Sequence, residues 1–240
     1  KALLANLQPD LVHAGPIQDV AFLIAKAGFH PLLTMSWGFD LMKDAYQSPF
    51  SRWQTRYALR RSDAVTLDCQ ATADRAAAFG FPRERICVFP WGVDLDFFSP
   101  QNSVVPGKKW RAQKNWEDKT VLLCLRSWEP NYGVDVLARA FVLAARENPR
   151  LRLILLGDGS QADKIYALLR GQEEKVYFGG RVELEELPGW YGAADLYVSP
   201  SHVDGSSVSL LEAMACGLPS IVSDIPANLE WIQDGRNGWI

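Results

Sequence analysis

The stretch DGSSVSLLEAMACGLP, from Asp204 to Pro219, decides the fold because it joins a strand to a helix through a short polar turn. An aliphatic run at 195–199 predicts the strand, and the largely apolar run from Val208 to Ala215 predicts the helix. Ser206 or Ser207 suits the N-cap, and the closing Gly-Leu-Pro stops the helix. A helix N-terminus that follows a strand and a glycine offers backbone N–H groups and a positive dipole end to an anion.

Glu212 lies in the middle of this apolar run, where a carboxylate needs a partner that offsets its burial. One hypothesis is a sugar diol, which donates two hydrogen bonds to a carboxylate. The other is a nearby cation, with which Glu212 ties two elements together. The segment by itself leaves both hypotheses open.

The composition bounds the class of protein. The chain has 240 residues, enough for one large or two small domains, and a net charge of −3, which argues against a nucleic-acid partner. No apolar run approaches the ~20 residues that span a bilayer, and the N-terminus lacks a signal-peptide pattern. The four cysteines have no paired spacing, which predicts reduced thiols in a cytoplasmic protein rather than a zinc site or a disulfide framework.

Short β-branched or aliphatic runs alternate with amphipathic runs along the chain. Strands are predicted at 10–14, 32–36, 64–68, 85–89, 120–125, 151–156, 175–178, 195–199 and 219–223. The clearest helix lies at 134–147, where Leu137, Phe141 and Ala144 recur at helical spacing. The alternation predicts an α/β protein with parallel sheets and helices on both faces of each sheet.

The segment 99–118 breaks this alternation, because it contains two prolines, several polar residues and a basic cluster. It predicts a linker between two Rossmann-like domains, which then cover 1–98 and 119–240. The ligand is expected at the carboxyl ends of the second domain's strands, facing the cleft.

The chain resembles glycosyltransferase family 4, which has the GT-B fold. Asp204 and Glu212 bracket seven residues and lead into Ala-Met-Ala-x-Gly-x-Pro, as the two acids of that family do, with Asp204 in place of the usual Glu. Similar stretches follow the family's order at 9–15, 62–100, 122–141, 155–160, 175–182 and 228–240. The resemblance implies an incomplete acceptor-side domain at 1–98 and a donor-binding domain at 119–240 whose C-terminal end is missing. It therefore implies a fragment that lacks both natural ends.

The resemblance also implies an activity. It is that of a retaining, hexosyltransferase-like enzyme that moves a sugar from a nucleotide diphosphate sugar to a hydroxyl acceptor. The acceptor is a glycan or glycolipid, in surface polysaccharide or glycolipid synthesis, and no cofactor is implied. A sugar-nucleotide epimerase of the same fold and a non-catalytic nucleotide-sugar-binding module are the alternatives.

Arg126 follows the strand predicted at 120–125, so its guanidinium is expected at the carboxyl end of a parallel strand. There it either forks onto diphosphate oxygens or remains a solvated strand-end arginine. The resemblance favours the diphosphate and implies three catalytic residues, Asp204, Arg126 and His13. It places the donor against Arg126, Gly180, Arg181, Val182, Gly205, Ser206, Ser207, Val208, Ser209, Leu210 and Glu212.

Two positions depart from the family. Tyr132 stands where the family has a lysine that meets the diphosphate, so only a neutral hydroxyl is expected there. Either Arg126 and the helix dipole suffice, or another cation substitutes, for which Lys164 and Arg181 are the candidates. Gly15 stands where the second histidine of a His-x-His pair lines the sugar pocket, which favours His13 as an ordinary strand-end histidine.

A metal site is not predicted. Asp94 and Asp96 form an Asp-x-Asp pair, which marks the metal-dependent GT-A transferases. The pair is short and common by chance, and its place beside the linker matches the inter-domain turn of the GT-B fold. We therefore interpret it as a turn.

A basic and aromatic pattern at 50–60 makes peripheral membrane contact a minority hypothesis, at the inner face of the membrane. Three arginines share one helical face and three aromatic residues share another: Arg52, Arg56 and Arg60, and Phe50, Trp53 and Tyr57. The commoner alternative is a helix that is solvated on one face and packed on the other.

Overall fold

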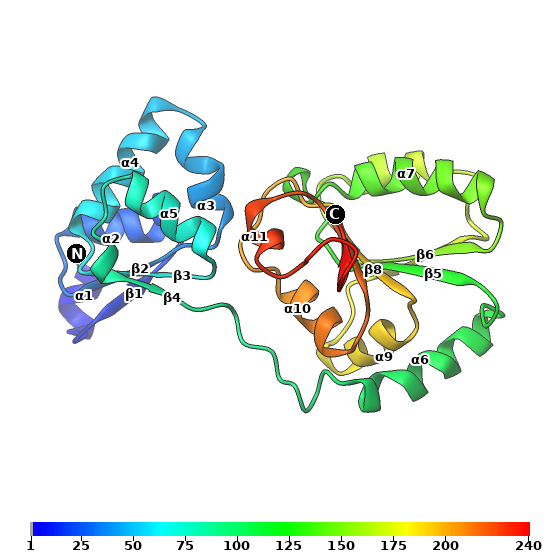
Figure 1. Cartoon of the computed structure of the whole chain (residues 1–240). Helices are drawn as coiled ribbons and strands as arrows, with labels where there is room; N and C mark the ends of the chain where they lie inside the picture. The colour runs from blue at the N-terminus through cyan, green and yellow to red at the C-terminus, as the bar shows by residue number, and fades with distance from the viewer. Residues whose placement is uncertain (1) are drawn as a thin grey trace. The chain divides into compact units, whose positions relative to one another are not determined.

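The computed structural model describes residues 2–240 and contains two compact units. The first comprises the chain up to Trp91 together with Val203–Ser206, and the second comprises Gly92–His202 together with Ser207–Ile240. Each unit has its own parallel sheet (Figure 1). The predicted α/β class with two parallel sheets is therefore confirmed.

The first unit is built on a four-stranded parallel sheet with the order β1-β2-β3-β4. Its strands are β1 (Val12–Ala14), β2 (Leu32–Met35), β3 (Ala64–Leu67) and β4 (Ile86–Val88). Its helical segments are α1 (Ala2–Leu7), η1 (Ile17–Ala21), α2 (Phe22–Ala27), α3 (Phe39–Met42), η2 (Asp44–Tyr46), α4 (Pro49–Arg61), α5 (Gln70–Ala78) and η3 (Arg83–Arg85). Aliphatic side chains of the strands and helices, among them Leu32, Leu59 and Val65, form one core. The predicted strands are confirmed here to within two residues at each end.

The second unit is built on a six-stranded parallel sheet with the order β10-β9-β8-β5-β6-β7. Its strands are β5 (Thr120–Cys124), β6 (Leu151–Leu156), β7 (Val176–Gly180), β8 (Leu196–Ser199), β9 (Ser220–Val222) and β10 (Gly238–Trp239). Its helical segments are α6 (Pro100–Lys114), η4 (Pro130–Tyr132), α7 (Val134–Glu147), α8 (Ala162–Leu168), η5 (Leu184–Glu186), α9 (Leu187–Gly192), α10 (Val208–Ala215) and α11 (Pro226–Leu229). The strand order reverses between β5 and β8. In doubly-wound sheets, ligands bind at the carboxyl ends of the strands where this reversal occurs.

Side chains of the second sheet alternate between two cores, because successive strand residues point to opposite faces. Val121 of β5 joins the core that contains side chains of α9 and α10, whereas Leu122 joins the core that contains Phe141 of α7. Figure 1 shows α7 on one side of this sheet and α9 and α10 on the other. The prediction of helices on both faces is confirmed for this unit.

The segment 99–118 is mostly helical, which corrects its prediction as a linker. It contains α6, which belongs to the second unit, and that unit already begins at Gly92. Pro100 is at the first turn of α6, where a missing N–H costs no helical hydrogen bond. The helix packs closely against α9 because glycines meet there, and a Cβ at Gly107 would lie only 2.1 Å from the carbonyl carbon of Gly192.

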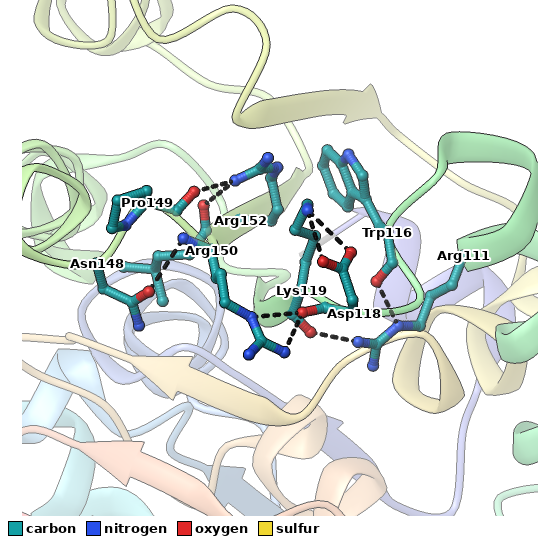
Figure 2. A network of polar contacts seen from close by, with 9 residues as sticks. Arg111, Trp116, Asp118, Lys119, Asn148, Pro149, Arg150 and Arg152 are labelled. Atoms are coloured by element: carbon teal, nitrogen blue, oxygen red, sulfur yellow. Dashed lines mark hydrogen bonds and ion pairs between the residues drawn. The ribbon is translucent and has the colours of Figure 1, made fainter.

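Arginine side chains close the end of the second sheet where β5 and β6 begin (Figure 2). Arg150 Nε donates to the Asp118 carbonyl over 2.7 Å, and Arg111 Nε donates to the Trp116 carbonyl over 3.1 Å. Arg111 also forms an ion pair of 2.8 Å with Asp195, just before β8. These cations hold loops at the amino ends of the strands, opposite the ends where a ligand is expected.

Candidate functional site

Arg126 follows β5 and lies half-buried where the strand order reverses. Its Nη1 donates to Ser207 Oγ over 2.6 Å and to Ser209 Oγ over 3.3 Å. The hydroxyl of Tyr197, on β8, forms a hydrogen bond of 2.7 Å with Ser209 Oγ. The predicted place of Arg126 at a strand end is therefore confirmed, and the fold brings its guanidinium to the start of α10.

The helix α10 begins and ends as the sequence predicts. Ser207 is its N-cap residue, although its side chain makes no capping hydrogen bond and instead accepts from Arg126. At the other end Leu218 N donates to the Ala213 carbonyl over 2.9 Å, and Gly217 adopts a φ of +73° that few other residues tolerate. The first-turn N–H groups of a helix have no partner within it, so a cation and a helix N-terminus meet here.

Glu212 is 8% exposed and accepts a hydrogen bond of 2.6 Å from the hydroxyl of Tyr191, on α9. Burial raises the pKa of the Glu212 carboxyl, and the bond from Tyr191 lowers it in part. Within residues 2–240 the structure gives Glu212 no ion pair, so the cation hypothesis is wrong for the described chain. The sequence analysis did not identify Tyr191 as the partner of Glu212, because its local sequence pattern does not indicate a contact with α10.

Tyr132 meets Arg126 through the face of its ring. The guanidinium carbon of Arg126 lies 4.3 Å from the centre of the Tyr132 ring, within the range of cation–π contacts. Lys164, one candidate replacement for the missing lysine, forms an ion pair of 2.8 Å with Asp135, and its role at the donor stays a prediction. Arg181 is exposed in the turn after β7.

The turn predicted to hold the nucleotide base lies at the carboxyl end of β7, on the same edge of the sheet as Arg126. Gly180 has a φ of +63°, and a Cβ added there would meet nothing within 4 Å. Val182 is half-buried and packs on the core that also contains α9 and α10. The backbone of this turn is accessible to a ligand, and its contact with a base stays a prediction.

Glycines after β6 hold the segment that carries Arg126. A Cβ at Gly157 would lie 3.1 Å from the Arg126 carbonyl oxygen, and a Cβ at Gly159 would lie 2.6 Å from that of Trp128. Trp128 Nε1 donates to the Leu156 carbonyl over 3.2 Å, which fixes the same segment from the other side. These glycines therefore position Arg126 by close backbone packing.

Asp204, Gly205 and Ser206 belong to the first unit, so the structure does not group them with Arg126. Ser206 N donates to the Asp68 carboxylate over 3.0 Å, and Ser206 Oγ donates to the Asp68 carbonyl over 2.6 Å. A Cβ at Gly205 would lie 1.9 Å from Asp68 Oδ2. Burial raises the pKa of the Asp68 carboxyl, and the nearby charge of Asp204 raises it further. The sequence analysis missed Asp68, although its place just after β3 was a usable signal.

His13 lies exposed on β1 in the first unit, and its Nε2 is 3.3 Å from Thr66 Oγ1. This contact with the neighbouring strand fits a strand-end histidine, and a catalytic role stays a prediction. Asp94 caps its own turn, because its Oδ1 accepts from the N–H groups of Asp96 and Phe97, each over 3.0 Å. Among residues 2–240 no group of three His, Cys, Asp or Glu side chains is placed to hold a metal ion.

Two family profiles cover nearly all of the chain. Residues 118–240 match "Glycosyl transferases group 1", and residues 1–97 match "Glycosyltransferase Family 4". The chain belongs to the group 1 glycosyltransferases of family 4. The residues of α6 lie between the two matches.

Two curated relatives show the range of this family. The chain is 28% identical over 239 residues to a GDP-mannose-dependent alpha-(1-6)-phosphatidylinositol monomannoside mannosyltransferase of Mycolicibacterium smegmatis, with 95% of this chain and 61% of that enzyme covered. It is 32% identical over 155 residues to mannosylfructose-phosphate synthase of Agrobacterium fabrum, with 60% and 34% covered. The chain thus spans about three fifths or less of the length of these relatives.

Solved structures confirm the GT-B fold. HepE of Anabaena, in complex with UDP-glucose, superposes with a TM-score of 0.84 at 23% identity, over 99% of this chain and 66% of that one. Sucrose-phosphate synthase of Thermosynechococcus elongatus gives a TM-score of 0.78 at 21% identity, over 99% and 62%. Among residues 2–240 no helix is long and apolar enough to cross a membrane.

Proposed function

We propose that this glycosyltransferase binds a nucleotide diphosphate sugar on its second unit and transfers the sugar to a hydroxyl acceptor with retention of configuration. The observation that carries the proposal is the hydrogen bond from Arg126 to Ser207 at the start of α10. It joins a permanent cation to a helix N-terminus at the strand reversal of a doubly-wound sheet. The membership of the group 1 family supports the same activity.

In this proposal Arg126 and the first N–H groups of α10 stabilise the departing diphosphate, on which negative charge develops. Glu212 accepts hydrogen bonds from the ribose diol through the carboxylate that Tyr191 already orients. Asp204 orients the donor sugar or steadies positive charge on it, and the turn at Gly180 to Val182 holds the base. GDP-mannose is the first donor to test, because the mycobacterial relative is named for it.

The test of donor binding is Arg126→Ala. Loss of a hydrogen bond to a charged group should weaken nucleoside diphosphate binding by about 1.5–3 kcal/mol and leave nucleoside binding unchanged. Calorimetric titrations of GDP, UDP and the two nucleosides measure both effects. Arg139→Ala is the control, because Arg139 is half exposed and pairs with Asp135. Equal losses for diphosphate and nucleoside would show that Arg126 does not contact the phosphates.

The products separate the three possible functions. Incubation of the protein with a labelled nucleotide sugar and an acceptor should yield a glycosylated acceptor whose new linkage keeps the donor's configuration. An epimerised nucleotide sugar would identify an epimerase, and binding without either product would identify a binding module. We propose a glycan or glycolipid acceptor, since the relatives include an enzyme named for a phosphatidylinositol mannoside.

We also propose that the donor binds without a divalent cation. Two observations support this proposal. Arg126 brings a positive charge to the α10 N-terminus, and the Asp94 carboxylate already accepts hydrogen bonds from two backbone N–H groups of its own turn. Addition of a chelator should change the affinity for nucleoside diphosphate by less than about twofold. For comparison, a loss of about 1.4 kcal/mol of binding free energy weakens the affinity tenfold. A strict requirement for Mg²⁺ or Mn²⁺ would contradict this proposal and make Asp94 and Asp96 the candidate metal ligands.

We propose peripheral contact of α4 with an anionic membrane surface. Phe50 and Trp53 are 61% and 50% exposed and stack on each other at 5.6 Å. Arg52, Arg56 and Arg60 are exposed on the same helix. In vesicle flotation, Arg56→Gln should weaken binding to anionic vesicles about fivefold, the effect of roughly 1 kcal/mol per basic residue. Lys108→Gln, in the second unit, is the control, and equal binding to neutral and anionic vesicles would refute the contact.

A further inference from the structure

We propose that Tyr132 is a positioning residue that holds the guanidinium of Arg126 for the diphosphate, in the place where the family has a second cation. The inference rests on the proposed donor-binding function. It assigns to the ring face of Tyr132 the task of orienting the guanidinium that donates to Ser207 and Ser209 at the start of α10.

The first step of the argument is the geometry of the guanidinium. Its carbon lies 4.3 Å from the centre of the Tyr132 ring. Its Nη1 donates to Ser207 and Ser209. The planar group is thus held by an aromatic face and two hydroxyls of the protein itself. A long side chain that is already ordered loses less entropy when it binds a ligand.

The second step is the rigidity of the Tyr132 backbone. Tyr132 N donates to the Glu129 carbonyl over 3.0 Å, and the neighbouring Asn131 carbonyl accepts from His202 N over 2.8 Å. Gly133 has a φ of +61°, and a Cβ there would lie 2.1 Å from the Pro200 carbonyl oxygen. The short helix η4 therefore packs against the loop that follows β8, and this contact fixes the position of the Tyr132 backbone.

The third step is the supply of positive charge. Lys164, the sequence-based candidate for the missing lysine, is paired with Asp135, and burial of Asp135 at the start of α7 keeps that pair in place. A ring that stacks on Arg126 cannot add charge. It can keep the guanidinium aimed at the helix start, where Nη1 donates to Ser207 and Ser209.

The experiment compares Tyr132→Leu with Tyr132→Phe, using GDP and UDP as ligands and guanosine and uridine as controls. Loss of a cation–π contact should weaken diphosphate binding about 2- to 30-fold in Tyr132→Leu. Tyr132→Phe keeps the ring and should stay within about twofold of the parent protein, since the ring face supplies the contact. Nucleoside binding should not change in either variant. Tyr46→Leu is the matched control, because it removes a half-exposed ring with an arginine over it, Arg75, in the first unit.

A double-mutant cycle separates positioning from general stability. In an Arg126→Gln background, Tyr132→Leu should have no further effect on diphosphate affinity, because there is no guanidinium left to hold. An undiminished effect in that background would overturn the proposal. Equal losses in Tyr132→Phe and Tyr132→Leu would also overturn it, because they would assign the role to the hydroxyl.

A ligand-free readout distinguishes this inference from the proposed function. The NMR signals of the Arg126 side chain should be shifted by the Tyr132 ring current, retain that shift in Tyr132→Phe and lose it in Tyr132→Leu. If the parent protein binds no nucleoside diphosphate, the proposed function fails while the ring contact is still decided by these signals. If Arg126 signals are the same in all three proteins, the contact is absent and the positioning role is refuted.

Discussion

At the scale of single residues, the site is built from polar groups whose burial is compensated in different ways. Arg126 is surrounded by hydroxyls and an aromatic face, whereas Glu212 has the phenol of Tyr191 as its partner. A buried carboxylate with one neutral donor remains costly to ionise, which is why its pKa is raised. A ligand diol would add two donors to the one that Tyr191 provides.

The raised pKa of Glu212 gives donor binding a pH dependence with a definite sign. The diol needs the ionised carboxylate as an acceptor, so ribonucleoside diphosphate affinity should fall as the pH drops through the Glu212 pKa, which lies above 4.5. Tyr191→Phe removes the bond that lowers this pKa, so the midpoint of the loss should move to higher pH. Calorimetric titrations across pH measure the midpoint, and 2′,3′-dideoxy ligands are the control. A midpoint that stays in place would refute the coupling between the two side chains.

Sequence reasoning placed Arg126 and Glu212 correctly because each follows from one local pattern, a strand end and an apolar helix. It missed the ring contact of Tyr132 and the hydrogen bond of Tyr191. Each of these joins side chains from two different segments: Arg126 follows β5 and meets Tyr132 on η4, and Tyr191 on α9 meets Glu212 on α10. Which face of a ring meets a guanidinium depends on the packing of the whole unit, and no spacing rule contains that information.

At the scale of elements, the helix α6 shows how composition can mislead. Prolines and polar residues at 99–118 predict an inter-domain linker, yet Pro100 suits a helix start and most of the polar side chains are solvated. Tertiary packing decides the outcome, since glycines of α6 and α9 let the two backbones approach closely. The strands and α7 were predicted well because their periodicity and their burial agree.

The close approach of α6 and α9 should tolerate no added methyl group. A Cβ at Gly192 would lie 1.9 Å from the Ser103 carbonyl oxygen, so Gly192→Ala forces the helices apart. Overpacking of this kind costs about 1–3 kcal/mol, more than the gain in helix propensity from replacing glycine. Chemical denaturation measures the change in the free energy of unfolding. Gly92→Ala is the control, because a Cβ there would meet nothing within 4 Å and should leave stability nearly unchanged.

At the scale of the whole molecule, the cores follow the division into two units. One core draws only on residues from Ala14 to Phe81 among its buried members, and the other two draw on residues from Phe98 onward. Units with separate cores can unfold in separate transitions, for which a single free energy of unfolding is not defined. The groups proposed to hold the nucleoside diphosphate are Arg126, the start of α10, Glu212 and the turn at Gly180, all of which lie in the second unit, so binding of this ligand should act on one transition.

Calorimetry of the protein should therefore show two unfolding transitions. Leu59→Ala removes a buried side chain of the first unit. It should lower the free energy of unfolding for one transition by about 2–5 kcal/mol, the cost of such a cavity. Leu153→Ala, in the core that packs against α7, should lower the free energy of unfolding for the other transition by a similar amount. A nucleoside diphosphate at 100 times its dissociation constant should raise only the transition sensitive to Leu153→Ala, by about 2.7 kcal/mol, because it binds that unit only when folded. A single transition that both variants and the ligand shift equally would show that the two units unfold together.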